Sequence, residues 1–219
     1  MGYVDDTKLL LALPPNQITD AVSMLNADLR EITKWCCRNS LLLLNPDKTK
    51  LLVIGVPQLT KTLWTLSVTL MGKNIEPVTI AKDLGIYIDN SLNYNDYIKR
   101  ISSSCIYKLI MIHRIKYLLD KKTILLLIHS FVFNKLLYCS SVWSDTSKKN
   151  IKKLQHLQNF AARIVLGLKK YDHISEGLLS LGWLDINHKL KFNDCVMMYK
   201  CLNESVAVAE PQGAVTTWT

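Results

Sequence analysis

The chain has 219 residues, of which 49% are hydrophobic and 21% are charged, so it can bury a core and does not belong to the disordered class. The longest nearly apolar run, Ile124–Phe133, is too short to span a bilayer as a helix, and we expect neither a transmembrane segment nor a membrane partner. The first residues lack the basic and apolar regions of a secretory signal, which favours an intracellular protein of the nucleus or cytoplasm.

Positive charge is concentrated in the second half of the chain. Residues 1–96 carry 9 basic and 10 acidic side chains, a net charge of −1, whereas residues 97–200 carry 18 basic and 6 acidic side chains, a net charge of +12. So basic a region indicates a polyanionic partner, with nucleic acid favoured over a membrane surface. The alternative is that these basic side chains have no charged partner and simply form the solvated faces of ordinary helices.

The first 90 residues predict a mixture of hairpins and one helix. Short apolar runs on either side of Asp5-Asp6-Thr7 predict a β-hairpin, and a second hairpin is expected around the turn Gly72-Lys73-Asn74. Apolar residues spaced by three and four from Ile18 to Trp35 predict an amphipathic helix. The remaining β-like runs are expected at residues 41–44, 51–54 and 84–88, with a turn at residues 45–48 between the first two.

Apolar stripes of helical period replace this pattern after Asp89. Asp185 is placed to cap the last of the predicted helices, and Gly167 lies near the end of the one before it. The fold class is therefore α+β, with a mixed domain at residues 1–92, an all-helical bundle at residues 93–203 and a loose tail at residues 204–219. The four helical stripes cover residues 98–115, 124–136, 151–168 and 186–202.

The cysteines and two of the tryptophans are interpreted as packing residues. None of the six cysteines stands in a CxxC pair or in a zinc-like spacing with histidine, and all lie among apolar neighbours in the sequence. We therefore expect buried, reduced thiols. Trp35 and Trp143 are expected in the core rather than as platforms on which bases stack.

Two adjacent carboxylates, Asp5 and Asp6, stand between the strands of the first predicted hairpin. Like charges at short range repel each other, and a divalent cation would offset that repulsion. Mg²⁺ prefers carboxylate oxygens, and paired ions of this kind support phosphoryl transfer. The alternative is a solvated turn, in which aspartate is a preferred residue.

Several segments, in this order, resemble motifs of the reverse transcriptases of non-LTR (LINE-type) retrotransposons. Tyr3-Val4-Asp5-Asp6 is similar to the (Y/F)xDD motif, residues 35–50 resemble WCxxNxLxLNPxKTK, and residues 82–89 resemble KxLGVxxD. In the helical half, LYCSSVW at 137–143 and LQHLQNFAARI at 154–164 resemble segments that follow the polymerase motifs. The resemblance runs from about residue 2 to residue 203 and covers the C-terminal part of the polymerase domain from the YxDD motif onward.

This resemblance implies an RNA-directed DNA polymerase that transfers nucleotides with two metal ions, Mg²⁺ or Mn²⁺. It implies an RNA template, a DNA primer and deoxynucleoside triphosphates as partners. Residues 1–92 would form part of the palm, with the DD hairpin and a primer-grip-like hairpin, and residues 93–203 would form the helical thumb and connection.

The resemblance also implies roles for individual residues. Asp5 and Asp6 would bind the metal ions and Lys48 would meet the phosphates of the incoming nucleotide, although Lys48 also reads as an exposed turn lysine. Leu84 and Gly85 would lie in the primer-grip hairpin, where Gly85 permits close backbone approach or marks a bulge. In the basic helical half, the nucleic-acid contacts would come from Lys99, Arg100 and Lys108.

The family's remaining catalytic aspartate and its fingers precede the DD motif, whereas this sequence opens with Met1-Gly2 directly before it. We therefore expect a fragment of a polymerase that is inactive by itself. Two alternatives stay open at this point. One is a non-catalytic helical module that binds nucleic acid, and the other is a structural or interaction fragment with no nucleic-acid role.

Overall fold

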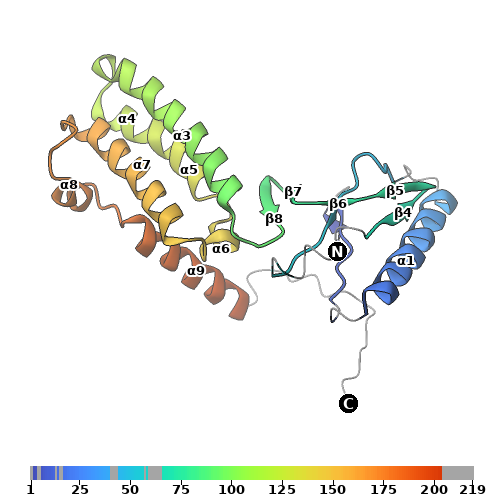
Figure 1. The fold of residues 1–219 in the computed structure, drawn as a ribbon. Helices are drawn as coiled ribbons and strands as arrows, with labels where there is room; N and C mark the ends of the chain where they lie inside the picture. Colours follow the sequence, from blue (N-terminus) through green and yellow to red (C-terminus); the bar gives the residue numbers. More distant parts are fainter. Residues whose placement is uncertain are drawn as a thin grey trace. The chain divides into compact units, whose positions relative to one another are not determined.

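The computed structural model describes residues 2–3, 6–12, 14, 17–39, 44–56, 58 and 66–203. These fall into two compact units, one up to Leu92 and one from Asn93 onward, and each is described by itself. The first unit combines small sheets with a long helix, and the second consists of helices (Figure 1). This mixture agrees with the α+β class expected from the sequence.

The chain opens with a short hairpin. Strand β1 (Gly2–Tyr3) pairs antiparallel with β2 (Asp6–Thr7), so that Gly2 lies opposite Thr7 and Tyr3 lies opposite Asp6. The predicted hairpin is therefore present, but Asp6 and Thr7 belong to a strand and not to the turn. The connection is shorter than expected because antiparallel strands can be joined by only two residues. Residues 4 and 5, which join these strands, lie outside the described residues.

Helix α1 (Ile18–Arg38) packs on the hairpin of β4 (Val68–Leu70) and β5 (Lys73–Ile75), which lies along it in Figure 1. The turn consists of Met71 and Gly72, both with positive φ, whereas the sequence placed it at residues 72–74. A two-residue turn of this kind matches the twist of the strands, so pairing continues up to it. The buried core here comprises Leu29, Val68, Leu70 and Ile75, with Leu25, Leu44 and Leu51 packed against it.

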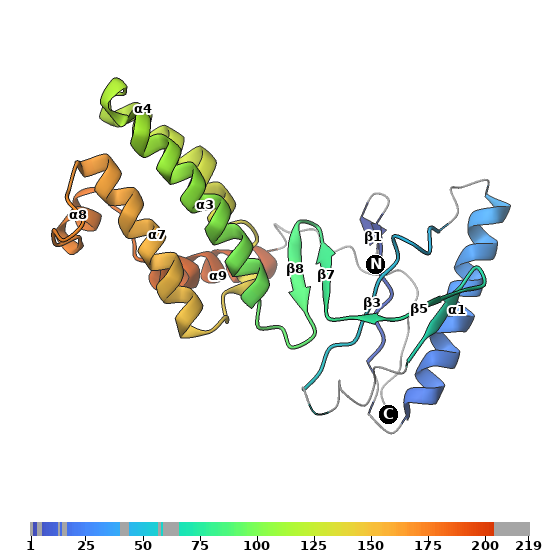
Figure 2. The ribbon, with the colours of Figure 1, turned by 45° about the horizontal axis from the view of Figure 1, so that its top comes forward.

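Two further strand pairs complete the first unit. Strand β3 (Leu51–Leu52) runs parallel to β6 (Pro77–Val78), a pairing between segments that are not consecutive. Strands β7 (Ile80–Asp83) and β8 (Ile86–Asp89) form an antiparallel hairpin, seen side by side in Figure 2. The strand predicted at residues 84–88 therefore begins at Ile86. Of the run expected at residues 41–44, residues 41–43 lie outside the described part of the chain.

The second unit contains the four predicted helical stretches. They are α3 (Asn95–Ile115), a segment of α4 (Lys121–Ile128), η3 (His129–Phe133) and α5 (Asn134–Leu136), then α7 (Lys148–Leu166) and α9 (Ile186–Leu202). The five residues of η3 form a π-helical turn within the second stretch. Three short helices were not predicted, namely η2 (Lys116–Leu118), α6 (Ser140–Trp143) and α8 (Ser175–Ser180).

The helix ends follow the sequence signals. Gly167 ends α7 with a φ of 69°, and the Asp185 side chain accepts a hydrogen bond from the backbone N–H of His188 at the start of α9.

Trp143 is fully buried, with its indole N–H donating to the Tyr138 carbonyl over 3.0 Å. Its place in the core is confirmed. Burial also raises the pKa of the neighbouring Tyr97 to about 12.

Other predictions about burial were wrong. Trp35 is 58% exposed, because the strands packed on α1 cover the side of Leu29 and leave that of Trp35 open. All six cysteines are free thiols, but only Cys36 and Cys105 are buried. Apolar neighbours in the sequence do not predict the burial of Cys195 and Cys201, because apolar side chains remain exposed along α9. None of the helices among the described residues is long and apolar enough to cross a membrane.

Candidate polymerase and nucleic-acid site

The DD hairpin is partly described. Asp6 opens strand β2 opposite Tyr3, while Asp5 lies outside the described residues. Among the residues that the structure describes, no group of three or more His, Cys, Asp or Glu side chains is placed to hold a metal ion. The metal-binding role of Asp5 and Asp6 therefore stays a prediction.

An ion pair connects the DD hairpin to the hairpin of the KxLG-like motif. Lys8 follows β2 directly, and its ammonium nitrogen lies 2.7 Å from a carboxylate oxygen of Asp83, the last residue of β7. Both side chains are partly exposed, at 40% and 31%. The two hairpins that the resemblance assigns to the catalytic centre and the primer grip are thus linked within one compact unit.

The tip of the β7–β8 hairpin consists of Leu84 and Gly85. Their φ values are 42° and 90°, and the strand register continues unbroken to the pair Asp83–Ile86. Two central residues with positive φ define a tight turn, so the interpretation of Gly85 as a bulge is wrong. Leucine rarely adopts this conformation, yet Leu84 holds it at a position where the residue is 41% exposed. Such strain is concentrated at functional positions in proteins.

Lys48 stands in a well-ordered turn. The backbone N–H groups of Lys48 and Thr49 both donate to the Asn45 carbonyl over 3.1 Å, and the Asn45 side chain accepts from the Asp47 N–H over 2.9 Å. The Lys48 side chain is exposed. Its neighbour Asp47 forms an ion pair with Lys73 of β5, and the hydrogen bond from Lys73 lowers the pKa of that carboxyl. The turn therefore contacts β5, which the sequence alone did not indicate.

The three basic residues predicted to contact nucleic acid fall into two environments. Lys99 and Arg100 are exposed near the start of α3. Lys108, about two and a half turns beyond Lys99, is partly buried. Its ammonium group donates to the Phe131 carbonyl over 2.9 Å and lies 5.7 Å from the centre of the Phe131 ring. Lys108 therefore links α3 to the π-helical turn η3, and the structure does not bring it together with Lys99.

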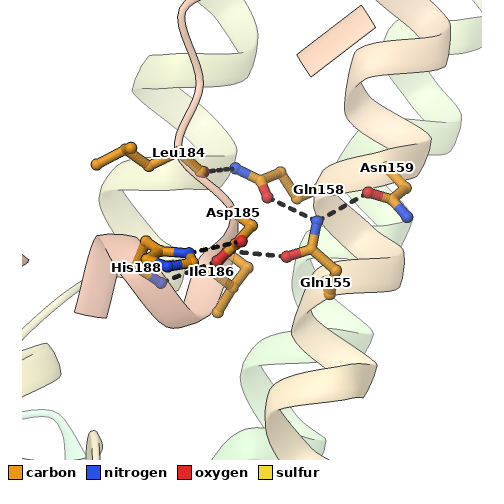
Figure 3. Close-up of polar contacts among 7 residues, drawn as sticks. All are labelled: Gln155, Gln158, Asn159, Leu184, Asp185, Ile186 and His188. Carbon is orange, nitrogen blue, oxygen red and sulfur yellow. Dashed lines mark hydrogen bonds and ion pairs between the residues drawn. The ribbon is translucent and has the colours of Figure 1, made fainter. Parts of the chain in front are cut away.

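The LQHLQN segment of α7 holds the start of α9. As Figure 3 shows, Gln158 donates to the Leu184 carbonyl and Gln155 accepts from the Ile186 N–H, each over 2.8 Å. Gln155 also donates to Gln158 and Asn159, over 2.9 and 2.8 Å. The Gln155 oxygen thereby supplies the partner that the N–H of Ile186, the first residue of α9, lacks within the helix. The motif residues at 155 and 158 therefore have a structural role in this chain.

Asp185 and His188 complete the same junction (Figure 3). The carboxylate of Asp185 accepts from the His188 backbone N–H over 2.9 Å and lies 2.7 Å from the His188 Nδ1. Partial burial acts to raise the pKa of Asp185, but the hydrogen bonds from His188 outweigh it and the pKa is lowered. The carboxylate therefore stays charged at the N-terminus of the helix, where a negative charge is favourable.

Four exposed lysines at the start of α7 were not among the predicted site residues. Lys148, Lys149, Lys152 and Lys153 all lie on its solvent side. The signal that could have found them is the sequence KKNIKK, in which basic residues recur at helical spacing within a region of high positive charge.

The chain is 27% identical over 176 residues to a probable RNA-directed DNA polymerase from transposon BS of Drosophila melanogaster. It resembles a transposon polymerase. The match covers 77% of this chain, and the chain spans 18% of the length of that relative. No family model and no solved structure matches the chain. The similarity supports a reverse-transcriptase-like segment.

Proposed function

We propose that this chain is a segment of the RNA-directed DNA polymerase of a non-LTR-type retrotransposon, containing part of the palm and the helices that follow it. The observation that carries the proposal is the similarity to a transposon polymerase over 77% of the chain. The structure adds support, because the DD hairpin and the Leu84-Gly85 hairpin occur in one compact unit and are joined by the Lys8–Asp83 ion pair.

In the parent polymerase, Asp5 and Asp6 would hold Mg²⁺ or Mn²⁺, since adjacent carboxylates offer the hard oxygen atoms that these ions prefer. When bound, the ions would stabilise the attacking and leaving oxygens of nucleotide transfer. Lys48 would meet the phosphates of a deoxynucleoside triphosphate from its exposed turn. Leu84 and Gly85 would contact the DNA primer on an RNA template. Nucleotide transfer is proposed for the parent, and the 219 residues by themselves are proposed to be inactive.

The first test establishes what the chain is a segment of. The transcript and the genomic DNA upstream of codon 1 are sequenced. We expect an in-frame continuation that encodes polymerase fingers and a further palm aspartate. Stop codons or unrelated sequence at that position would contradict the proposal that the chain is a segment of a working polymerase.

The second test concerns catalysis. The longer protein is given an RNA template, an annealed DNA primer, deoxynucleoside triphosphates and Mg²⁺ or Mn²⁺. We expect primer extension that Asp6→Asn abolishes, whereas Asp28→Asn, which removes an exposed carboxylate from α1, leaves it intact. The 219-residue chain should give no extension. Extension by the longer protein that survives Asp6→Asn would refute the role of the DD hairpin.

A further inference from the structure

The start of α7 concentrates positive charge. Lys148, Lys149, Lys152 and Lys153 lie within its first six residues, and the helix contains no acidic residue. Cations are unfavourable near a helix N-terminus, and like charges three or four residues apart repel each other. In the described part of the chain, none of these lysines forms an ion pair with an acidic side chain. The arrangement therefore has an electrostatic cost that an anionic partner would remove.

The other side of α7 is committed to the core. Leu154, Leu157, Ala161 and Ile164 are buried, so the lysines form the solvent side of an amphipathic helix. A helix that binds a membrane surface exposes apolar side chains for insertion beside its basic ones. Here those apolar side chains face the bundle, and this favours a nucleic-acid backbone over a lipid surface as the partner.

Helix α3 borders the same surface. Helices α3 and α7 lie side by side in Figures 1 and 2. Their starts are joined by a 2.8 Å hydrogen bond from the Asn150 amide to the Asn95 side chain. Further along, the rings of His113 and Phe160 lie 6.0 Å apart. Asn95 and His113 thus mark the side of α3 that faces α7.

Helical spacing places charged residues at this seam. Lys99 follows Asn95 by four residues on the same side of α3, and Lys153 precedes Phe160 by seven residues on the same side of α7. Lys99 therefore borders the seam from one helix while Lys149 and Lys153 border it from the other. Together with Lys148 and Lys152 they form the set of residues that we call the α3–α7 basic face.

We propose that the α3–α7 basic face (Lys99, Lys148, Lys149, Lys152 and Lys153) binds the phosphate backbone of a nucleic-acid duplex without reading its sequence. Successive turns place the lysines about 5.4 Å apart along the axis of α7, so that several can contact phosphates of one strand. The inference rests on the proposed function for its choice of duplex, which is an RNA–DNA hybrid. It assigns the contact chiefly to α7, which the sequence resemblance did not.

The test measures binding of the full 219-residue chain to a dye-labelled RNA–DNA hybrid by fluorescence anisotropy at several salt concentrations. One variant carries Lys148→Gln, Lys149→Gln, Lys152→Gln and Lys153→Gln. The matched control carries Lys121→Gln, Lys122→Gln, Lys169→Gln and Lys170→Gln, four exposed lysines of the same unit whose loss changes the net charge equally. Glutamine preserves helix propensity, and circular dichroism checks that each variant folds.

We expect the α7 variant to lose roughly tenfold or more in affinity at moderate salt, and the control to lose much less. The slope of log K against log salt should fall by about 0.9 for each phosphate contact removed. If the fourfold variant does not fold, the pair Lys149→Gln and Lys153→Gln should give an intermediate loss.

Three results would overturn the proposal. They are equal losses in both variants, no binding of the hybrid by the wild-type chain at low salt, and binding to anionic lipid vesicles in place of the hybrid. Failure of this proposal is distinguishable from failure of the proposed function. If only the α7 variant loses affinity and no polymerase sequence lies upstream, the α3–α7 basic face is supported and the proposed function is refuted. If polymerase sequence lies upstream and both variants lose affinity equally, the proposed function is supported and the basic face is refuted.

Discussion

The ammonium group of Lys8 and the carboxylate of Asp83 meet at 2.7 Å although 75 positions separate them in the sequence. Lys8 follows the DD hairpin and Asp83 precedes the Leu84-Gly85 turn, so the position of one hairpin constrains the other. Because both side chains remain partly exposed, the pair contributes modestly to stability and more to relative placement.

A double-mutant cycle on this ion pair measures its strength. We expect Lys8→Gln and Asp83→Asn to show a coupling free energy of no more than about 1 kcal/mol in urea unfolding, and less at high salt. The control cycle uses Glu31 and Lys34, an exposed pair on α1, and should give a smaller coupling. No coupling between Lys8 and Asp83 would mean that the pair does not hold the two hairpins together.

A second prediction concerns the strained tip of the β7–β8 hairpin. Leu84→Asn creates an Asn-Gly turn, which suits positive φ at both positions, and should raise the free energy of unfolding by about 0.5–1 kcal/mol. Leu84→Ala removes the same side chain without relieving the backbone, so it serves as the control. A loss of stability in the asparagine variant would show that packing of the leucine outweighs its backbone strain.

The two tryptophans should respond very differently to truncation. Trp143 is fully buried, and Trp143→Ala should reduce the free energy of unfolding by about 3–5 kcal/mol because it leaves a large cavity. Trp35 is 58% exposed, and Trp35→Ala should change it by less than about 0.5 kcal/mol. Urea unfolding followed by circular dichroism measures both. Comparable losses would contradict the burial described for these residues.

The cap of α9 predicts a dependence of stability on pH. The pKa of Asp185 is lowered in the folded chain, so the stability it contributes is present above its unfolded pKa and is lost as the pH falls through the folded value. Asp185→Ala should therefore cost about 1 kcal/mol near neutral pH, and the difference from the wild type should shrink below about pH 4. Urea unfolding across this pH range measures it.

The control for that experiment is Asp120, which caps α4 through the Lys122 N–H and whose pKa is also lowered, chiefly by a hydrogen bond from Thr123. Asp120→Ala should show the same direction of pH dependence. A cost for Asp185→Ala that stays constant down to pH 2 would show that its charge does not matter to the cap.

Much of the fold could be predicted because its signals are local. The periods of α1, α3, α7 and α9, and the caps at Gly167 and Asp185, depend on neighbours within a few turns. The parallel pair β3–β6 and the ion pair between Lys8 and Asp83 depend on segments far apart in the sequence, which periodicity does not report.

The candidate site divides in the same way. The strand pairing beside Asp6 follows from the short-range pattern. The turn at Leu84-Gly85, which that pattern placed in a strand, and the partner of Lys108 could not be predicted from it. The Phe131 carbonyl lies within the π-helical turn η3, which the apolar pattern does not predict. Phe131 lies within the apolar stripe at residues 124–136, yet it is 51% exposed.

That π-helical turn also explains how one face of the α4–η3–α5 segment stays buried. Its most buried residues, Ile124, Ile128, Val132 and Leu136, recur every four positions. In a regular α-helix each step of four would rotate the side chain by about 40°, so Leu136 would point about 120° away from Ile124. The wider turn at residues 129–133 unwinds the helix and absorbs this drift. It restores the angular alignment of these side chains, so that residues spaced four apart all remain on one buried face of the segment.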